Sequence, residues 1–130
     1  MGTLGAMVFG VGIDCIEVAR IAARIGGEEG LVEKVFTAGE RAYCAARHDP
    51  AQHFAARFAA KEALFKALGT GWGGGMRWQE VEVVNEENGR PRLELRGQVA
   101  AFATEQGITR VHVSLTHVKE LACAVVVLET

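Results

Sequence analysis

The 130-residue sequence lacks the features that would assign it at once to a specialised class. Its formal net charge is only −2, so the whole chain carries no charge excess for nucleic acid or for a membrane surface. No apolar run approaches the roughly 20 residues that a membrane-spanning helix needs. The first six residues also lack the charged and apolar regions of a signal peptide. We therefore expect no nucleic-acid or membrane partner, and we regard residues 1–6 as a candidate leader before a natural start at Met7.

Cysteine is scarce, and its spacing contains no paired motif. Cys15, Cys44 and Cys123 are far apart and odd in number, and no C-x-x-C occurs. This pattern argues against a disulfide framework and favours a reducing cytoplasm. We expect the three residues to be small buried thiols.

Several catalytic motifs are also missing. The sequence contains no G-x-x-x-x-G-K-[ST] phosphate loop, no H-E-x-x-H zinc motif and no G-x-S-x-G nucleophile elbow. The four histidines show no zinc-ligand spacing. Walker-type nucleotide hydrolysis, zinc proteolysis and serine hydrolysis of the α/β-hydrolase type are therefore not indicated.

The segments that are present predict one α+β domain over residues 1–130, with a mainly antiparallel sheet packed against a long helix. Asp14-x-x-Glu17 resembles a helix start, Gly26-Gly27 resembles its end, and Thr37 with Glu40 forms a capping box. Asn88-Gly89 indicates a hairpin turn. Strands are predicted over 8–13, 81–83, 93–95, 111–115 and 121–129, and helices over 19–25, 38–47, 51–68 and 97–106. Along 111–115, the residues Val111, Val113 and Leu115 are expected to point inward, and His112 and Ser114 outward.

Asp14 and Glu62 are the acidic residues most open to two interpretations. Asp14 follows a buried strand, where it could cap a helix or hold a metal ion. Glu62 forms an i,i+4 pair with Lys66, which on a helix surface would be an ordinary ion pair. The helix that carries the pair is rich in alanine and phenylalanine and is predicted to be largely buried, where a charge needs a partner or a metal.

Two other segments could bind phosphate. Glycines in the loop 69–75 would let backbone N–H groups approach an anion closely, although a flexible connector has the same composition. Ser114 and His117 come at the end of an alternating strand. On its own, His117 could equally be a histidine that merely packs within the fold.

Taken together in order, these segments resemble the holo-[acyl-carrier-protein] synthase family, the small bacterial 4′-phosphopantetheinyl transferases. The resemblance covers nearly the whole chain. Its motifs are Gly12-Ile13-Asp14 with Arg20-Ile21, Phe36-Thr37 through Glu40 to Tyr43-Cys44, Arg57 through Ala63 followed by Lys66 through Gly71, Asn88 through Pro91, and Val113 through His117.

The resemblance implies a transfer of 4′-phosphopantetheine from coenzyme A to a serine of an apo-acyl carrier protein of fatty acid biosynthesis. It implies that Asp14 and Glu62 bind Mg²⁺ and that Glu62 orients or deprotonates the serine. It also implies that Lys66 steadies the pyrophosphate or protonates the leaving phosphate. Positions near the coenzyme A phosphates are implied for Arg57, Lys61, Gly69, Thr70, Gly71, Ser114 and His117.

The resemblance also implies an assembly and a docking surface. Members of this family are trimers with each active site between two subunits, so one subunit would give Asp14, Glu62 and Lys66 and its neighbour Ser114 and His117. Arg20 and Arg24, one helical turn apart, would dock the acidic helix of the carrier protein.

Three other functions stay open at this stage. The chain could be a non-catalytic protein that binds coenzyme A or the carrier, although an intact Asp14, Glu62 and Lys66 argues against this. It could serve polyketide or peptide-synthetase carriers, although relatives of that type are about twice as long. It could also be a purely structural oligomer.

Overall fold

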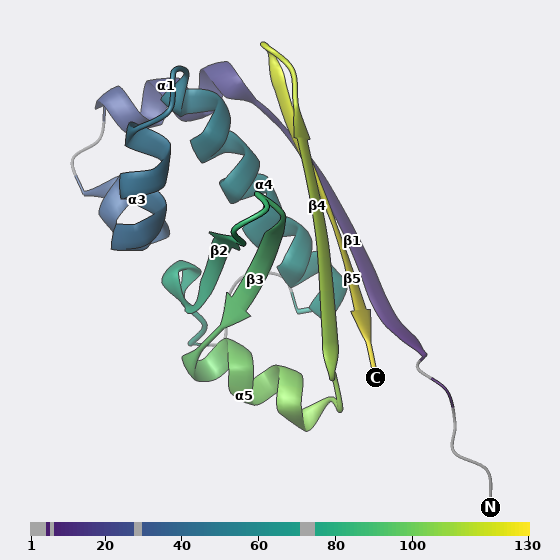
Figure 1. Ribbon diagram of the computed structural model, residues 1–130. Coiled ribbons are helices and arrows are strands. Elements are labelled where there is room, and N and C mark those ends of the chain that lie inside the picture. Colours follow the sequence, from purple (N-terminus) through teal and green to yellow (C-terminus); the bar gives the residue numbers. More distant parts are fainter. Residues whose placement is uncertain (1–4, 6, 28–29, 71–74) are drawn as a thin grey trace, which may run out of the picture.

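The fold is a helix laid across an antiparallel sheet, with smaller elements packed around one side. The computed structural model describes residues 5, 7–27, 30–70 and 75–130. Helix α4 (Pro50–Leu68) covers one face of a three-stranded sheet made of β1 (Val8–Glu17), β5 (Leu121–Glu129) and β4 (Arg110–His117), in that order (Figure 1). Both strand pairs are antiparallel. The predicted α+β class is therefore confirmed.

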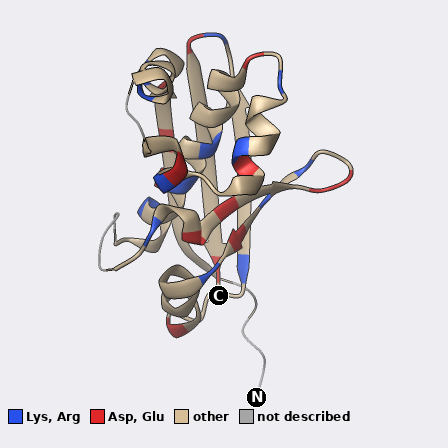
Figure 2. Cartoon of the chain, turned by 90° about the vertical axis from the view of Figure 1, so that its left-hand side faces the viewer, with Lys and Arg blue, Asp and Glu red and all other residues tan. Residues whose placement is uncertain are grey.

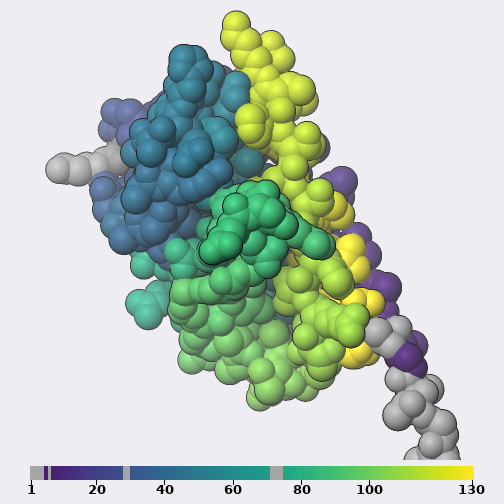
Figure 3. All heavy atoms as spheres, in the orientation of Figure 1, coloured from purple at the N-terminus to yellow at the C-terminus, as the bar shows by residue number. Residues whose placement is uncertain are grey.

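The remaining elements lie on the α4 side of this sheet (Figure 1). A second antiparallel pair, β2 (Val81–Asn85) and β3 (Pro91–Leu95), forms the predicted hairpin, and Gly89 in its turn has φ +88°. In Figure 3 the hairpin lies between α3 and β4. The helices are α1 (Val18–Gly27), α2 (Leu31–Val35), α3 (Ala38–Ala45) and α5 (Gly97–Glu105), with a 3-10 turn at Trp78–Glu80. Neither α2 nor the 3-10 turn is predicted from sequence, because each is too short to show a hydrophobic period.

Helix α4 is buried on nearly every side, as its composition predicts. Ala55, Ala59, Ala60 and Ala63 are completely inaccessible to solvent, and Leu64 is too. Small side chains allow close packing of the helix against its neighbours, and apolar residues are spread around it because it forms the centre of the core. Among the described residues, no helix has the length and hydrophobicity to cross a membrane.

Strand β1 lies directly against α4 because two of its residues have no side chain. A Cβ atom on Gly12 would overlap the carbonyl oxygen of Ala63, and one on Gly10 would overlap that of Ala67. The strand thus approaches the helix backbone as only glycine permits. The next inward-facing residue of β1 is Asp14, which the close approach brings beside the middle of α4.

One sequence prediction about this region is wrong. Asp14 does not cap a helix, because β1 continues to Glu17 in register with β5, and α1 begins only at Val18. The Val18 N–H donates to the carbonyl of Glu120 at 2.9 Å, so pairing with the C-terminal hairpin decides where the strand ends. Gly26 and Gly27 are the last two residues of α1, so the predicted end of this helix is confirmed.

Among the described residues, no helix covers the opposite face of the three-stranded sheet (Figure 1). Val11 and Ile13 of β1 point to this face and remain 58% and 63% exposed. The predicted alternation along β4 is confirmed, because Val111, Val113 and Leu115 pack against the core while Ser114 is exposed. The molecule therefore has one covered sheet face and one uncovered apolar face.

Candidate active site

An ion pair between β1 and α4 forms the centre of the candidate site. The Lys66 ammonium lies 3.1 Å from Asp14 Oδ1 and donates a hydrogen bond of 3.0 Å to the carbonyl oxygen of Ile13. The Lys66 side chain is 53% exposed and that of Asp14 is 18% exposed. The pair therefore lies at the surface, with the lysine accessible to a ligand.

Glu62 lies one helical turn before Lys66 and completes an acidic pair with Asp14. Burial, and then the negative charge of Asp14, raise the pKa of Glu62 above its usual range, while Lys66 opposes the shift. The two carboxylates thus repel each other across a half-buried space. The structure brings together the three residues that the sequence singled out, although they come from two elements.

This acidic pair suits a hard divalent cation. Within the described ranges, no group of three or more His, Cys, Asp or Glu residues gathers as a complete metal site. Mg²⁺ does not need one, since it usually binds one or two carboxylates and takes its other oxygens from water and substrate phosphate. A cation between Asp14 and Glu62 would also remove the repulsion that raises the Glu62 pKa.

A cluster of cationic side chains surrounds Tyr43 of α3. The guanidinium of Arg47 lies 4.1 Å from the centre of the Tyr43 ring, and that of Arg57 lies 4.0 Å from it. Arg57 is buried, donates to Asn85 Oδ1 at 2.6 Å, and forms no ion pair with a carboxylate among the described residues. Its Nε atom is buried without a hydrogen-bond partner. No carboxylate among the described residues therefore neutralises this guanidinium directly.

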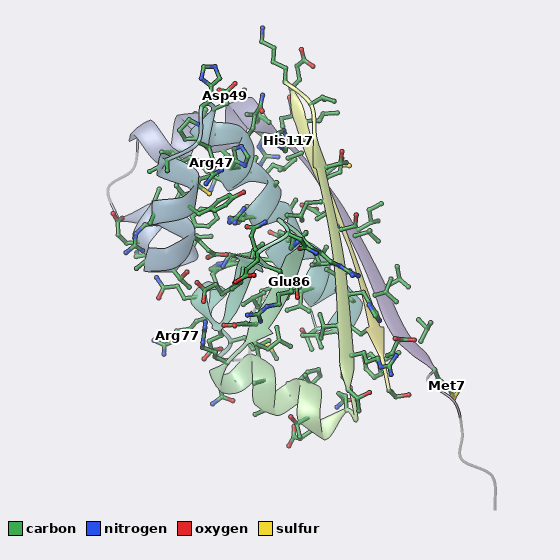
Figure 4. All side chains as sticks on the ribbon, viewed as in Figure 1. Met7, Arg47, Asp49, Arg77, Glu86 and His117 are labelled. Carbon is green, nitrogen blue, oxygen red and sulfur yellow. The ribbon has the colours of Figure 1, made fainter. Side chains whose placement is uncertain are left out.

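His117 joins this cluster from the end of β4. Its ring packs edge-to-face on that of His53, with centroids 5.1 Å apart, and His53 in turn lies 6.0 Å from the Tyr43 ring. Figure 4 shows Arg47 and His117 at the same end of the molecule. Burial, then the neighbouring His117, Arg57 and Arg47, lower the pKa of His53. His117 is therefore not an isolated histidine.

Lys61 has a different environment from the one that the resemblance implies. Its side chain is completely buried and forms an ion pair of 2.8 Å with Glu40, whose side chain is also completely buried. The ammonium also donates to the carbonyls of Trp78 and Val81. Burial lowers the pKa of Lys61, and Glu40 opposes the shift. With its donors used inside the core, Lys61 anchors α4 to α3 and to the backbone around Trp78 and Val81.

An apolar groove of about 250 Å³ opens beside Glu62. Arg20 and Arg24 of α1 line it, together with Phe58 and Glu62 of α4. Its other lining residues are aliphatic or aromatic: Ile16, Ile21, Ile25, Leu31, Val32, Val35 and Phe36. The two arginines predicted for docking therefore share one groove with a predicted metal ligand.

The other predicted phosphate-binding residues are dispersed. Gly69 ends α4 with φ +83°, and Thr70 follows it at the surface. Gly71 lies outside the described residues. Ser114 is on the uncovered sheet face, whereas His117, three positions later, points to the α4 side, because successive side chains alternate across a sheet. Ser114 and His117 of one chain therefore do not share one site.

Comparison with known proteins assigns the chain to a family. Residues 10–126 match the family model described as "4′-phosphopantetheinyl transferase superfamily". The chain belongs to that superfamily. The holo-[acyl-carrier-protein] synthase of Geobacter sulfurreducens is 46% identical over 126 residues, which cover 95% of this chain and 98% of that protein.

Solved structures of the superfamily share the fold. The holo-[acyl-carrier-protein] synthase of Neisseria meningitidis superposes with a TM-score of 0.86 at 29% identity, covering 95% of this chain and 100% of that one. The Bacillus anthracis synthase, solved in complex with CoA (3′,5′-ADP), gives a TM-score of 0.79 at 36% identity, covering 95% of this chain and 98% of that one.

Three residues of the cluster around Tyr43 are not predicted from the sequence as site residues. Tyr43, Arg47 and His53 carry no motif that marks them as binding residues. Their spacing offered a partial signal, because His53 and Arg57 are four apart and share one side of α4, whereas Arg47 lies just beyond the end of α3. The contact of Arg57 with Tyr43 depends on how α3 packs against α4.

Proposed function

We propose that this chain is a holo-[acyl-carrier-protein] synthase, which transfers 4′-phosphopantetheine from coenzyme A to a serine of an apo-acyl carrier protein. The second product is adenosine 3′,5′-bisphosphate. The observation that carries the proposal is the convergence of Asp14, Glu62 and Lys66 from β1 and α4 in a member of this transferase superfamily. A carrier protein of fatty acid biosynthesis, in the cytoplasm, is the acceptor that we propose.

The chemistry requires a proton acceptor and a stabilised leaving group. The serine oxygen attacks the phosphorus nearer the pantetheine arm, and the bond to the adenosine bisphosphate breaks. Glu62 orients or deprotonates the serine hydroxyl, and its raised pKa makes it a better base. Lys66, half exposed beside Asp14, holds positive charge where the leaving phosphate gains negative charge.

Asp14 and Glu62 are the residues that would hold Mg²⁺. When bound, the ion supplies positive charge that polarises the phosphoryl oxygens. Lys66 already contacts Asp14 Oδ1, so the carboxylate would share its negative charge between the ammonium and the cation.

The cluster of Arg47, Arg57, His53 and His117 around Tyr43 is the proposed site for coenzyme A phosphate. Arg57 Nε lacks a partner, and the guanidinium groups face the Tyr43 ring instead of a carboxylate. A phosphate group would provide the negative charge that these two guanidinium groups lack. Thr70 and the glycine loop stay candidates for the same ligand, whereas Lys61 contributes by fixing the turn of α4 that precedes Glu62.

The carrier protein is proposed to dock over the groove between α1 and α4. Arg20 and Arg24 are exposed there and would pair with acidic residues of the carrier. Because Glu62 lines the same groove, a carrier held by these arginines would present its serine close to the acidic pair. Figure 2 shows basic and acidic residues interspersed over the chain, so a local contact of this kind fits better than a wholly basic face.

A homotrimer is the proposed assembly, with active sites between subunits. The uncovered sheet face exposes Val11 and Ile13, which is the kind of apolar surface that a subunit contact buries. Ser114 lies on that face too, where a neighbouring subunit would meet it. In this arrangement, Ser114 lies at the subunit contact, and His117 lies on the other face of the sheet.

The first test is the intact mass of an apo-acyl carrier protein after incubation with this protein, coenzyme A and Mg²⁺. A gain of one phosphopantetheine group that EDTA prevents is the expected result. If several apo-carriers gain no mass, the transferase proposal fails and a binding function takes its place. A gain that is insensitive to EDTA would reject the metal assignment alone.

A further inference from the structure

Two of the three cysteines meet on the uncovered sheet face, although 108 residues separate them in sequence. Cys15 of β1 and Cys123 of β5 are direct partners in the antiparallel register. Their Sγ atoms are 2.6 Å apart. Cys15 is exposed and Cys123 is half-buried, so the pair is a surface feature.

We propose that Cys15 and Cys123 form a redox-active dithiol, which closes to a disulfide within one chain on reaction with a low-molecular-weight disulfide such as oxidised glutathione. Directly opposed residues of antiparallel strands have Cα atoms about 4.5–5.5 Å apart, within the range that a disulfide bridges. The backbone therefore needs little movement, and the two sulfur atoms already touch.

The exchange proceeds in two balanced steps. The sulfur of Cys15, as a thiolate, attacks oxidised glutathione, forming a mixed disulfide and releasing one glutathione thiolate. The sulfur of Cys123 then attacks the Cys15 sulfur, which releases the second glutathione. Two protein thiols are oxidised, one glutathione disulfide is reduced, and the two thiol protons pass to the released glutathiones.

The bond would join the first strand of the chain to the last. It would close a loop containing almost the whole domain, and a long closed loop restricts the unfolded state most strongly. It would also fix β1 to β5 one residue away from Asp14 without touching that side chain, which points to the other face of the sheet. We therefore expect the disulfide to raise stability while leaving the α4 side of β1 in place.

Cys44 provides an internal comparison. It is completely buried in the core, and burial raises the pKa of its thiol to about 11. A thiol that is both inaccessible and protonated reacts slowly with disulfides. The inference concerns Cys15 and Cys123 alone and does not rest on the proposed transferase function.

The test refolds the full chain from urea in a glutathione redox buffer, so that a subunit contact over the sheet face cannot block the reagent. The expected product has lost two hydrogen atoms in mass, and tryptic mapping should recover one linked peptide pair containing Cys15 and Cys123. Its unfolding midpoint should lie roughly 10 °C above that of the same protein after reduction.

Two variants provide controls. In Cys15→Ser, oxidation should give no intramolecular link and no shift in midpoint. In Cys44→Ser, the link and the shift between oxidised and reduced protein should both remain, whatever the starting stability. Three free thiols after refolding, a link through Cys44, or a stable glutathione adduct at Cys15 would each overturn the proposal. The carrier-protein mass assay is a separate measurement, so failure of one inference does not imply failure of the other.

Discussion

The charged residues of α4 differ in function because their partners differ. Lys61 has its donors occupied by Glu40 and two backbone carbonyls inside the core. One residue later, Glu62 faces Asp14 across a half-buried space, and Lys66 reaches solvent beside the same aspartate. A charge that is fully paired in the core holds the structure, whereas a charge whose neighbour repels it is available to a cation or a proton.

Replacing Glu62 by Gln should abolish most of the transfer while keeping the fold. The neutral side chain retains the shape but loses the metal ligand and the base, so we expect a fall of about 100-fold or more in rate. The unfolding midpoint should not fall, because burial and Asp14 already disfavour the charge of Glu62. The carrier mass assay and a thermal melt measure these effects, and wild-type activity in the variant would refute the assignment.

His53 should make folding stability sensitive to pH below neutrality. Its pKa is lowered from the usual 6.5 by burial and by the surrounding His117, Arg57 and Arg47, with Asp49 opposing. Because the folded pKa is the lower one, the unfolded chain takes up a proton at His53 more readily than the folded chain when the pH falls below the usual pKa of 6.5. Acidification therefore favours unfolding until the pH has fallen through the folded pKa.

The test for His53 compares the pH dependence of urea unfolding in the His53→Gln variant with that in the unmodified chain. Unfolding midpoints in urea, measured between pH 7 and pH 5, should fall less for His53→Gln than for the unmodified chain. Parallel curves for the two proteins would show that His53 does not contribute to this dependence.

At the level of elements, the contact between β1 and α4 controls the site. Gly10 and Gly12 let the strand lie against the helix backbone, and Asp14 is placed beside Lys66 by that contact. The Glu40–Lys61 ion pair ties α3 to α4 immediately before Glu62. Each acidic residue of the site is thus positioned by a neighbouring buried contact.

The substitution Gly12→Ala should push β1 away from α4. The added Cβ would overlap the carbonyl oxygen of Ala63, which belongs to a helix held in place by packing on nearly every side. We therefore expect the free energy of unfolding to fall by about 1–3 kcal/mol. Transfer activity should fall as well, because Asp14 moves with its strand. Gly26→Ala is the matched control, since a Cβ there meets no atom within 4 Å.

The Gly26→Ala control should not lose folding stability. Alanine in the last turn of α1 should leave stability unchanged or raise it by up to about 1 kcal/mol. Urea unfolding of both variants gives the free energies. Equal stability of Gly12→Ala and the unmodified protein would disprove the close approach.

For the whole molecule, the uncovered face of the sheet is the feature that a single chain leaves unexplained. Helices and the β2–β3 hairpin cover one side only (Figure 1), while Val11 and Ile13 remain mostly exposed on the other. Exposure of this apolar surface fits the proposed trimer, in which neighbouring subunits cover it.

Ile13→Asp should therefore prevent assembly. A carboxylate buried at a subunit contact lacks a partner and costs several kcal/mol, so the variant should sediment as a smaller species and lose activity. Val118→Asp changes an equally exposed apolar residue in the β4–β5 turn and should keep the original size. Sedimentation velocity measures both, and an unchanged mass for Ile13→Asp would reject this face as the subunit contact.

The sequence by itself determined most of what local interactions control. The Thr37–Glu40 capping box forms as predicted, with the Glu40 N–H donating to Thr37 Oγ1. Asn88-Gly89 turns the hairpin, and the composition of α4 identified a buried helix. These features depend on residues within a few positions of one another, which is why a sequence pattern predicts them. The motifs also indicated the superfamily, which the match over residues 10–126 shows.

Only the tertiary structure decided the properties that depend on distant segments. Asp14 continues a strand because Cys15, Glu17 and their neighbours pair with β5 near the other end of the chain. Lys61 is buried because Glu40 and the backbone after the glycine loop surround it. Two cysteines expected to be buried and separate meet at the surface for the same reason. Spacing along the chain does not determine which segments pair across the fold, and that pairing sets the partner, exposure and charge of each of these residues.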